Sequence, residues 1–247
     1  MSKITTIEEG VKALFDVNEL GAVPEYSIIK RKDGEFTDHL LLNGKTYPIF
    51  DWRYDAPTGL VSWYAQVGIG DTCSYKASGA ISESVGIDRF LYKELDTAES
   101  VLQSKIKHLT AFVNKNACNV ILRMQNDKVA VLELGATMPS DAEEQTHHSA
   151  WGTKGMVSDR VVSSKIRPQS VYLYNDGKNP TTYNDNNGIL YGLSADDCAK
   201  ASAIAMMLLN KVNYIEWADK HEHLLNCIKA VYKSNELGKR VSVTEVE

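Results

Sequence analysis

The chain has 247 residues, of which 43% are hydrophobic, enough apolar material for an ordinary buried core. Its 27 Lys and Arg residues against 32 Asp and Glu residues give a formal net charge of −5. Without long runs of one sign, this balance argues against a nucleic-acid or anionic-membrane partner. The N-terminal segment MSKITTIEEGVKALF lacks the continuous apolar stretch of a signal peptide or membrane helix, so we expect a cytoplasmic protein.

The four cysteines, Cys73, Cys118, Cys198 and Cys227, lie far apart in the sequence. They form neither a CxxC pair nor a Cys/His cluster with zinc spacing. We therefore expect reduced, mostly buried thiols and no metal ligands among them.

The first predicted element is a helix. Thr6 has the position of an N-cap, and Glu9 three residues later completes a capping box. Apolar residues recur at helical spacing behind it, at Ile7, Val11, Leu14 and Phe15. Gly21 then allows the chain to turn.

The next part of the chain is predicted to be rich in strands. Residues 26–30 and 39–42 show strand character around a turn at 32–34, and Asn43-Gly44 is typical of a further tight turn. The stretch 51–76, rich in aromatic residues and glycines, is predicted as a loop with short strands.

Apolar spacing predicts a buried helix over 81–95. Alternating patterns predict strands at 104–113, 118–124, 129–134, 160–166 and 170–174. The first three of these are expected to be antiparallel neighbours.

Two helices are predicted to close the chain. Ser194 with Asp197 favours one helix start, and a second helix over about 218–236 is expected to stop at Gly238. The order of elements predicts an α+β fold: a single open, mainly antiparallel β-sheet with helices packed on one face, forming one domain over 1–247.

A dinucleotide site needs a glycine-rich turn between a strand and a helix, where backbone amides meet the pyrophosphate. Gly68-Ile69-Gly70 is the nearest candidate, but no helix is expected to begin there, and a loop is the favoured interpretation. We therefore predict that this chain alone binds no cofactor.

Two pairs of histidines are candidate metal ligands. His147 and His148 are adjacent, and adjacent side chains in a strand face opposite sides. His221 and His223 are two residues apart, which does not place them on one helix face. Surface or polar-core roles are favoured for both pairs, and no metal site is predicted.

Aromatic residues gather around Arg53, at Trp52, Tyr54, Trp63 and Tyr64. Rings beside polar side chains suit sugar recognition by stacking. A core or subunit contact is the alternative, and we favour it because aromatic residues are equally common at protein interfaces.

Several segments in a fixed order resemble the C-terminal domain of the Gfo/Idh/MocA family, named for glucose-fructose oxidoreductase and inositol dehydrogenase. The resemblance covers nearly the whole chain. The matching segments are GVKALFDVNELGAV at 10–23, GAISESVGIDRFL at 79–91, VAVLELG at 129–135, WGTKGMVSDR at 151–160 and the closing segment 221–238.

The resemblance implies an open antiparallel sheet that binds a sugar or polyol on one face or packs subunits together. It also implies that the dinucleotide domain and the lysine of its Glu-Lys-Pro motif lie outside this sequence. The Asp and His of the family's catalytic helix correspond to Ser84 and Asp88. Because a serine cannot replace the carboxylate that orients an imidazole, the resemblance implies a degenerate site.

We therefore expect a stand-alone relative of an oxidoreductase substrate-binding domain, non-catalytic alone and acting as subunit or partner of a separate chain whose Rossmann domain binds NAD or NADP. The alternative is a carbohydrate- or polyol-binding or sensing protein without redox chemistry. An unaided enzyme using Asp88 and Lys154 ranks below both. A homo-oligomer formed through the sheet face is also expected.

The candidate catalytic positions are Ser84, Asp88 and Lys154. The candidate substrate-binding residues are Trp52, Arg53, Glu83, Asp88 and Lys154.

Overall fold

The computed structural model describes residues 3–140, 144–160, 171–175, 181–183 and 189–245. The chain divides into two compact units, the first from residues 1–59 and 185–222 and the second from 60–184 and 223–247. Helices α2 (Ala56–Val67) and α5 (Tyr214–Leu237) each contribute residues to both units. Each unit is therefore built from two separate segments of the chain.

The first unit combines helices with a small sheet. Its elements are α1 (Ile7–Val17), β1 (Ser27–Ile29), β2 (His39–Leu42), β3 (Lys45–Pro48), the 3-10 helix η1 (Asp51–Tyr54) and α4 (Ala195–Leu208). The predicted capping box is confirmed, since Thr6 and Glu9 each accept the other's backbone N–H. A Cβ at Gly10 would lie 2.9 Å from Leu193 Cδ1 and 3.2 Å from Ala201 Cβ, so this glycine lets α1 approach α4 closely.

The small sheet is antiparallel in the order β1-β2-β3. Asn43 and Gly44 both have positive φ, at 51° and 74°, which confirms the predicted tight turn between β2 and β3. In the core of this unit, the ring of Phe50 lies 5.4 Å from Trp52 and 5.1 Å from Trp217, edge to face.

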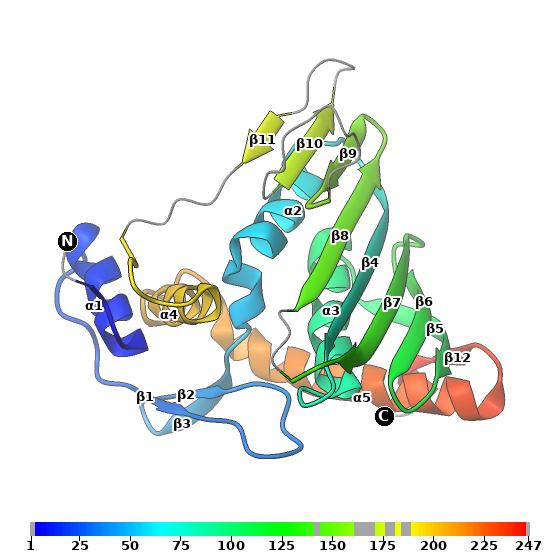
Figure 1. The fold of residues 1–247 in the computed structure, drawn as a ribbon, viewed down its shortest axis with the longest axis horizontal. Coiled ribbons are helices and arrows are strands. Elements are labelled where there is room, and N and C mark those ends of the chain that lie inside the picture. The colour runs from blue at the N-terminus through cyan, green and yellow to red at the C-terminus, as the bar shows by residue number, and fades with distance from the viewer. Residues whose placement is uncertain (1–2, 141–143, 161–170, 176–180, 184–188, 246–247) are drawn as a thin grey trace. The chain divides into compact units, whose positions relative to one another are not determined.

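The second unit is built on a nine-stranded sheet in the order β11-β10-β9-β8-β4-β7-β6-β5-β12 (Figure 1). Its strands are β4 (Thr72–Ser82), β5 (Ile106–Val113), β6 (Ala117–Met124), β7 (Val129–Met138), β8 (Gln145–Gly152), β9 (Gly155–Ser158), β10 (Val171–Asn175), β11 (Thr181–Tyr183) and β12 (Val241–Ser242), followed by the 3-10 helix η2 (Val243–Glu245). Only the β4–β7 pair is parallel among these described strands. The predicted α+β class and open, mainly antiparallel sheet are confirmed.

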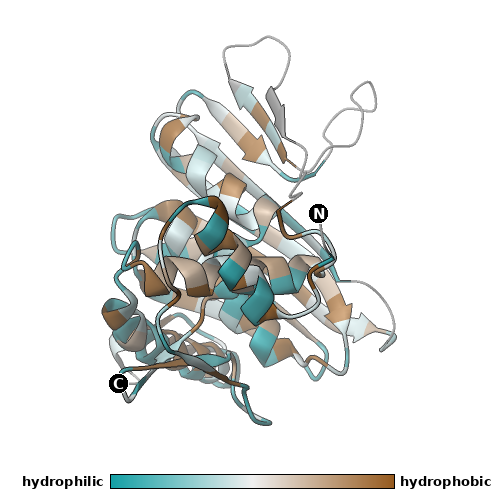
Figure 2. Ribbon diagram, turned by 90° about the vertical axis from the view of Figure 1, so that its left-hand side faces the viewer, coloured by the Kyte–Doolittle hydropathy of each residue, from teal (hydrophilic) through white to brown (hydrophobic). Residues whose placement is uncertain are grey.

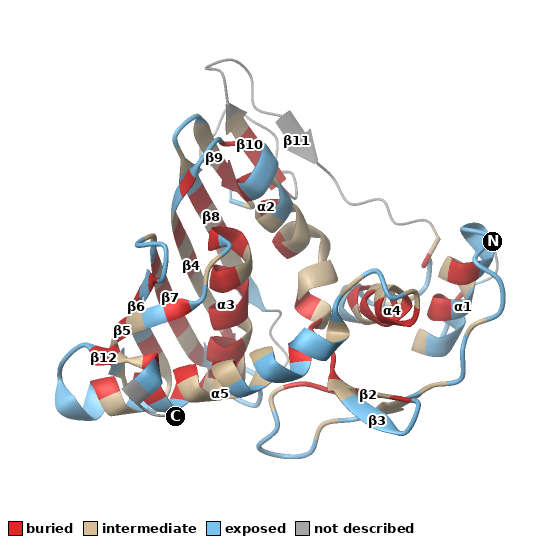
Figure 3. Ribbon diagram, turned by 180° about the vertical axis from the view of Figure 1, so that it is seen from behind, coloured by how far each residue is buried: buried red, intermediate tan, exposed pale blue. Residues whose placement is uncertain are grey.

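Helix α3 (Ile87–Leu102) covers one face of this sheet and is largely buried against it (Figure 3). Apolar residues are interspersed with polar ones along the strands and helices (Figure 2), and the strands alternate buried and more exposed positions. A Cβ at Gly79 would lie 2.7 Å from the Gln145 carbonyl oxygen and 2.8 Å from Phe90 Cζ. Glycine is therefore required where α3 crosses β4.

Helix α5 runs antiparallel to α3 within the second unit. The start of α3 contacts Tyr232 through Asp88, and its end contacts His223 through Glu99. The same helix also protects the β5 edge, because Ser234 and Asn235 accept hydrogen bonds from the backbone N–H groups of that strand. In the described ranges, no helix is long and apolar enough to cross a membrane.

Two of the predicted elements are wrong. The stretch 51–76, expected as a loop with short strands, contains η1, α2 and the start of β4. The Asp55 carboxylate accepts hydrogen bonds from the backbone N–H and hydroxyl of Thr58, which caps α2. The helix expected over 81–95 begins only at Ile87, because 81–82 still belong to β4.

Most of the other predicted helices and strands are present, although strands β3, β8, β9, β11 and β12 were not predicted. Strands β5, β6 and β7 are antiparallel neighbours, as predicted. Helix α4 begins after Ser194, whose hydroxyl accepts from Asp197 N–H, and α5 ends just before Gly238 with its positive φ. The strand predicted at 160–166 falls mainly outside the described residues.

Candidate functional site

Ser84 and Asp88, the positions matched to the catalytic pair, lie at the junction of β4 and α3. Ser84 occupies the turn before the helix, where its hydroxyl lies 2.7 Å from that of Ser82. Asp88 lies in the first turn of α3, where a carboxylate stabilises the helix N-terminus. Because α3 begins at Ile87, Ser84 lies outside the helix predicted over 81–95, and the two positions do not share a helix face.

The carboxylate of Asp88 accepts a hydrogen bond from the hydroxyl of Tyr232 on α5. Burial, and then this carboxylate, raise the pKa of Tyr232. Burial and the nearby Asp88 likewise raise the pKa of the Cys118 thiol on β6 to about 12. At neutral pH Cys118 therefore remains a thiol and Tyr232 a neutral phenol, so neither is an activated nucleophile.

A hollow of about 380 Å³ lies at the same end of the sheet. It is lined by Phe112, Asn114, Ala117, Cys118, Asn119, Glu133 and Leu134. Its volume falls in the lower range for small-molecule pockets, and its lining combines an aromatic ring with amide and carboxylate groups. This hollow and the neighbouring β4–α3 junction form the candidate binding region.

Glu83 and Lys154, two further predicted ligand contacts, lie at opposite ends of β4. Glu83 follows the strand in the turn that holds Ser84, and its exposed carboxylate lies 3.8 Å from Lys115 Nζ. Lys154 is exposed in the β8–β9 turn, where its N–H donates to the Ile69 carbonyl beside the start of β4.

The length of β4 separates Lys154 from Ser84 and Asp88. The strand has 11 residues, which corresponds to about 30 Å of extended chain. A single sugar-sized ligand therefore cannot contact Lys154 and Asp88 together.

The predicted aromatic cluster is divided between the two units. In the first unit Trp52 is only 8% exposed, and the Arg53 guanidinium stacks over the rings of Phe50 and Trp217 at 4.7 and 5.3 Å. In the second unit Trp63 is 54% exposed on α2 and packs against Tyr64. Trp52 and Arg53 therefore contribute to the packing of the first unit.

A buried charge network around His148 was missed by the sequence patterns. From β8, His148 Nδ1 lies 2.7 Å from Asp159 Oδ2, and its Nε2 lies 3.3 Å from Glu94 Oε1 on α3. The Tyr75 hydroxyl donates to the second oxygen of Glu94. Its neighbour His147 is 42% exposed, in keeping with side chains on opposite sides of the strand, although its Nδ1 still lies 4.0 Å from Asp159 Oδ1.

The carboxylates control the protonation of His148. Burial alone would lower its pKa, but the charge of Glu94 and the hydrogen bond to Asp159 outweigh burial and raise the pKa to about 10. Burial would raise the pKa of Glu94, but His148 outweighs it and lowers that pKa. The result is a buried imidazolium with a carboxylate at each ring nitrogen, a structural ion network.

The only sequence signal for this network was an acidic residue on the buried face of α3. Glu94 is fully buried, although it stands in a helix whose apolar spacing predicted a core-facing side. Such a residue requires a buried partner. The sequence did not indicate that the partner lies 54 residues later.

No protein-family model and no curated protein matches the sequence. Solved structures do match its fold. Levoglucosan dehydrogenase in complex with NADH and levoglucosan has a TM-score of 0.61 at 12% identity, covering 78% of this chain and 65% of that chain. An oxidoreductase from Agrobacterium radiobacter in complex with NAD+, L-tartaric acid and magnesium has a TM-score of 0.57 at 14% identity, covering 80% and 64%.

A myo-inositol dehydrogenase from Corynebacterium glutamicum has a TM-score of 0.52 at 17% identity, covering 78% of this chain and 63% of that chain. At these identities the likeness shows the fold. The chain spans less than two thirds of the length of the dehydrogenases it matches. The predicted resemblance to Gfo/Idh/MocA-type dehydrogenases, over part of their length, is confirmed at the level of fold.

Proposed function

We propose that this chain is a relative of the substrate-binding part of Gfo/Idh/MocA-type dehydrogenases and acts with a separate chain that binds NAD or NADP. The fold likeness carries the proposal, because it covers 78–80% of this chain in oxidoreductases solved with NAD+ or NADH. In this arrangement the present chain contributes substrate contacts, while the partner contributes the hydride acceptor.

The geometry of the matched positions argues against redox catalysis by this chain alone. Ser84 stands in a turn and contacts Ser82, while Asp88 accepts a hydrogen bond from Tyr232. Lys154, the third candidate catalytic residue, lies at the other end of β4 from these two. Nor do the 247 residues contain a glycine-rich dinucleotide fingerprint.

We further propose that the sheet face opposite α3 mediates homo-oligomer formation. Ile121, Val129 and Trp151 stand on three strands at outward positions and are 39–52% exposed. Exposed apolar side chains on neighbouring strands are typical of protein interfaces.

Carbohydrate or polyol binding without redox chemistry is the second candidate function. The hollow at the β5–β6 end favours it, because Phe112 lies beside the polar groups of Asn119 and Glu133. Trp52 no longer supports this function, since its ring is buried against Phe50.

Isothermal titration calorimetry of the purified chain with inositol, simple sugars and their phosphates tests the binding region. We expect one of these ligands to bind, and Asn119→Ala to weaken that ligand by roughly tenfold, the effect of one lost polar contact. Lys154→Ala, an equally exposed substitution at the far end of β4, is the control and should leave the affinity unchanged. No heat with any ligand, or equal losses in both variants, would contradict this assignment.

The same preparation, incubated with NAD+ and the bound polyol, separates the two candidate functions. The subunit proposal predicts no NADH from the chain alone and NADH formation once the partner chain is added. Carbohydrate binding without redox chemistry predicts no NADH, with or without the second chain. NADH production by the purified chain alone would overturn both.

A further inference from the structure

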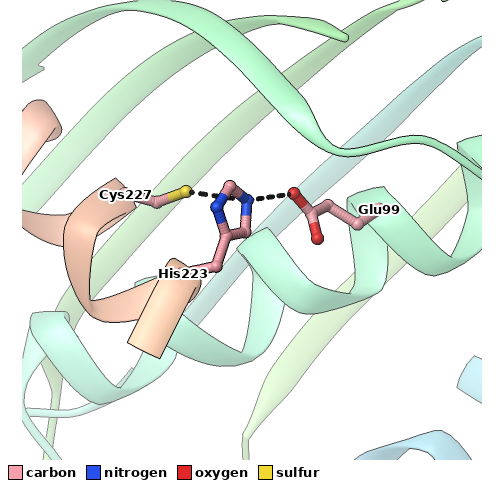
Figure 4. A group of neighbouring side chains, drawn as sticks. All are labelled: Glu99, His223 and Cys227. Carbon is pink, nitrogen blue, oxygen red and sulfur yellow. Dashed lines mark hydrogen bonds and ion pairs between the residues drawn. The ribbon is translucent and has the colours of Figure 1, made fainter. Parts of the chain in front are cut away.

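Three side chains with different donor atoms meet between α3 and α5 (Figure 4). Glu99 Oε1, near the end of α3, lies 2.7 Å from His223 Nε2 on α5. Cys227 Sγ lies 3.6 Å from that same nitrogen. All three donor atoms lie within 4.8 Å of one another.

Local structure fixes each donor. His223 and Cys227 are four residues apart on α5 and therefore share a helix face. Glu99 also accepts the backbone N–H of Ile106 at 2.7 Å, which orients its carboxylate at the start of β5. The donors are thus positioned by the fold.

The burial of these donors also differs from that of an ordinary surface cluster. Glu99 is 4% exposed, Cys227 is fully buried, and the His223 side chain keeps 12% exposure. Two donors are therefore shielded from water, while the imidazole leaves a route from solvent.

Both contacts of His223 converge on one nitrogen. With a hydrogen on Nε2, the ring donates to Glu99; with a lone pair there, it accepts from the Cys227 thiol but faces a carboxylate oxygen at 2.7 Å. Whether or not Nε2 carries a hydrogen, only one of its two contacts can be a good hydrogen bond. A divalent cation accepts lone pairs from nitrogen, oxygen and sulfur together.

The distances suit a tetrahedral ion with small adjustments. Zinc–ligand bonds of about 2.0–2.3 Å place neighbouring donor atoms about 3.3–3.7 Å apart. The sulfur–nitrogen distance of 3.6 Å already agrees, and the oxygen–nitrogen distance must open from 2.7 Å by about 0.6 Å. The sulfur–oxygen distance, which is at most 4.8 Å, must close by up to about 1.1 Å. Rotation of the carboxylate supplies a movement of that size.

We propose that Glu99, His223 and Cys227 bind one zinc-type divalent cation. Thiolate, imidazole and carboxylate together suit Zn²⁺ better than Mg²⁺ or Ca²⁺, which prefer oxygen ligands alone. Water completes the fourth position on the side where His223 is exposed. The ion crosslinks the end of α3 to α5, and its binding releases the thiol proton.

A plain ion pair between Glu99 and His223, closing the α3–β5 turn, is the alternative interpretation. In that interpretation the Cys227 sulfur makes a weak 3.6 Å contact with His223 Nε2 and no metal bond. The decisive observable is therefore a metal–thiolate bond.

The test is a titration of Co²⁺ into the chelator-treated full chain, followed by absorption spectroscopy. We expect one Co²⁺ per chain, a sulfur-to-cobalt charge-transfer band and the d–d bands of four-coordinate cobalt, all removed by Zn²⁺. A folded chain that binds no Co²⁺, or binds it without the charge-transfer band, would overturn the proposal.

Variants assign the bond to these residues. Loss of an outer-shell partner costs about 10–100-fold in metal affinity, so loss of a direct ligand in Cys227→Ser should cost roughly 100-fold or more and abolish the band. Cys118→Ser, at another buried cysteine, is the control and should bind normally. Unchanged binding by Cys227→Ser would exclude the site.

A second pair of variants keeps the test decisive if Cys227→Ser does not fold. His223→Gln retains a hydrogen-bonding side chain toward Glu99 but loses the imidazole, and should show the same loss of affinity. His221→Gln, two residues earlier on α5, should leave metal binding unchanged. Equal metal binding in the two variants would contradict the proposal.

Discussion

Two buried histidine clusters in the second unit contain similar residues but differ in the geometry of their contacts. His148 uses its two ring nitrogens separately, with Asp159 at Nδ1 and Glu94 at Nε2. His223 brings Glu99 and Cys227 to a single nitrogen. Contacts at separate nitrogens satisfy an imidazolium, whereas three different donor atoms within 4.8 Å of one another can surround one metal cation.

This difference shows that residue type alone does not distinguish a structural ion network from a metal site. Both clusters join α3 to another element, and both contain a buried glutamate from that helix. The direction in which the ring nitrogens point separates the two cases. Substitutions at each histidine should therefore have different consequences.

The largest expected effect is the loss of stability in His148→Gln. Removing the imidazolium leaves Glu94 and Asp159, both nearly inaccessible, without their cation. Breaking a buried ion pair from one side costs about 3–5 kcal/mol. Urea denaturation of the variant and the wild type measures this loss as a shift of the unfolding midpoint.

Two matched substitutions control that measurement. His147→Gln alters the half-exposed neighbour, whose contact with the network is a 4.0 Å approach to Asp159, and should cost about 1 kcal/mol or less. In metal-free protein, His223→Gln should cost about 1 kcal/mol or less, because glutamine still donates to Glu99. A loss at His148 no larger than at His223 would break the comparison.

A more gradual effect, spread over several pH units, is expected from the titration of His148. Its pKa rises from 6.5 in the unfolded chain to about 10 in the folded one, so the folded state binds the extra proton between these values. Its stabilising contribution is fully present below about pH 6.5 and is lost as pH rises toward 10. The slope contributed by one proton is at most about 1.4 kcal/mol per pH unit.

Glu94 limits the same contribution on the acidic side. Its folded pKa is lowered from 4.5, so the stabilisation from its carboxylate is lost as pH falls below that value. The network should therefore contribute most between about pH 4.5 and 6.5. The difference in unfolding free energy between the wild type and His148→Gln, measured across pH, gives the contribution of this network. A difference that does not fall from pH 6.5 to pH 10 would contradict the prediction.

Much of the fold was predictable because its signals are local. The capping box at Thr6 and the alternation in β5, β6 and β7 are readable from neighbouring residues. The prediction failed for α2, although Asp55 followed by Pro57 has the pattern of a capped helix start. Aromatic residues and Gly59 obscured that signal.

The boundary between β4 and α3 depended on partners far along the chain. Ile81 fits the apolar spacing of the following helix, but pairing with β7 keeps it and Ser82 in the strand. Because that pairing is parallel and long-range, no local pattern reveals it. The error moved Ser84 from a predicted helix face into a turn.

The candidate sites were less predictable for the same reason. The spacing of His223 and Cys227 is visible in the sequence, but Glu99 lies 124 residues from His223. Trp52 and Arg53 were predicted to bind a ligand. In the structure the Trp52 ring and the Arg53 guanidinium pack against aromatic rings within the first unit. Residue types indicate what chemistry is available, whereas the fold decides which groups meet.

Native mass spectrometry of the protein captured from its own cells tests the proposed function most directly. It reports stoichiometry, partner chains and retained ligands in one experiment. We predict more than one copy of this chain together with a second chain that carries bound NAD or NADP. A homo-oligomer with neither a second chain nor a dinucleotide, or a dinucleotide held by this chain alone, would contradict the account.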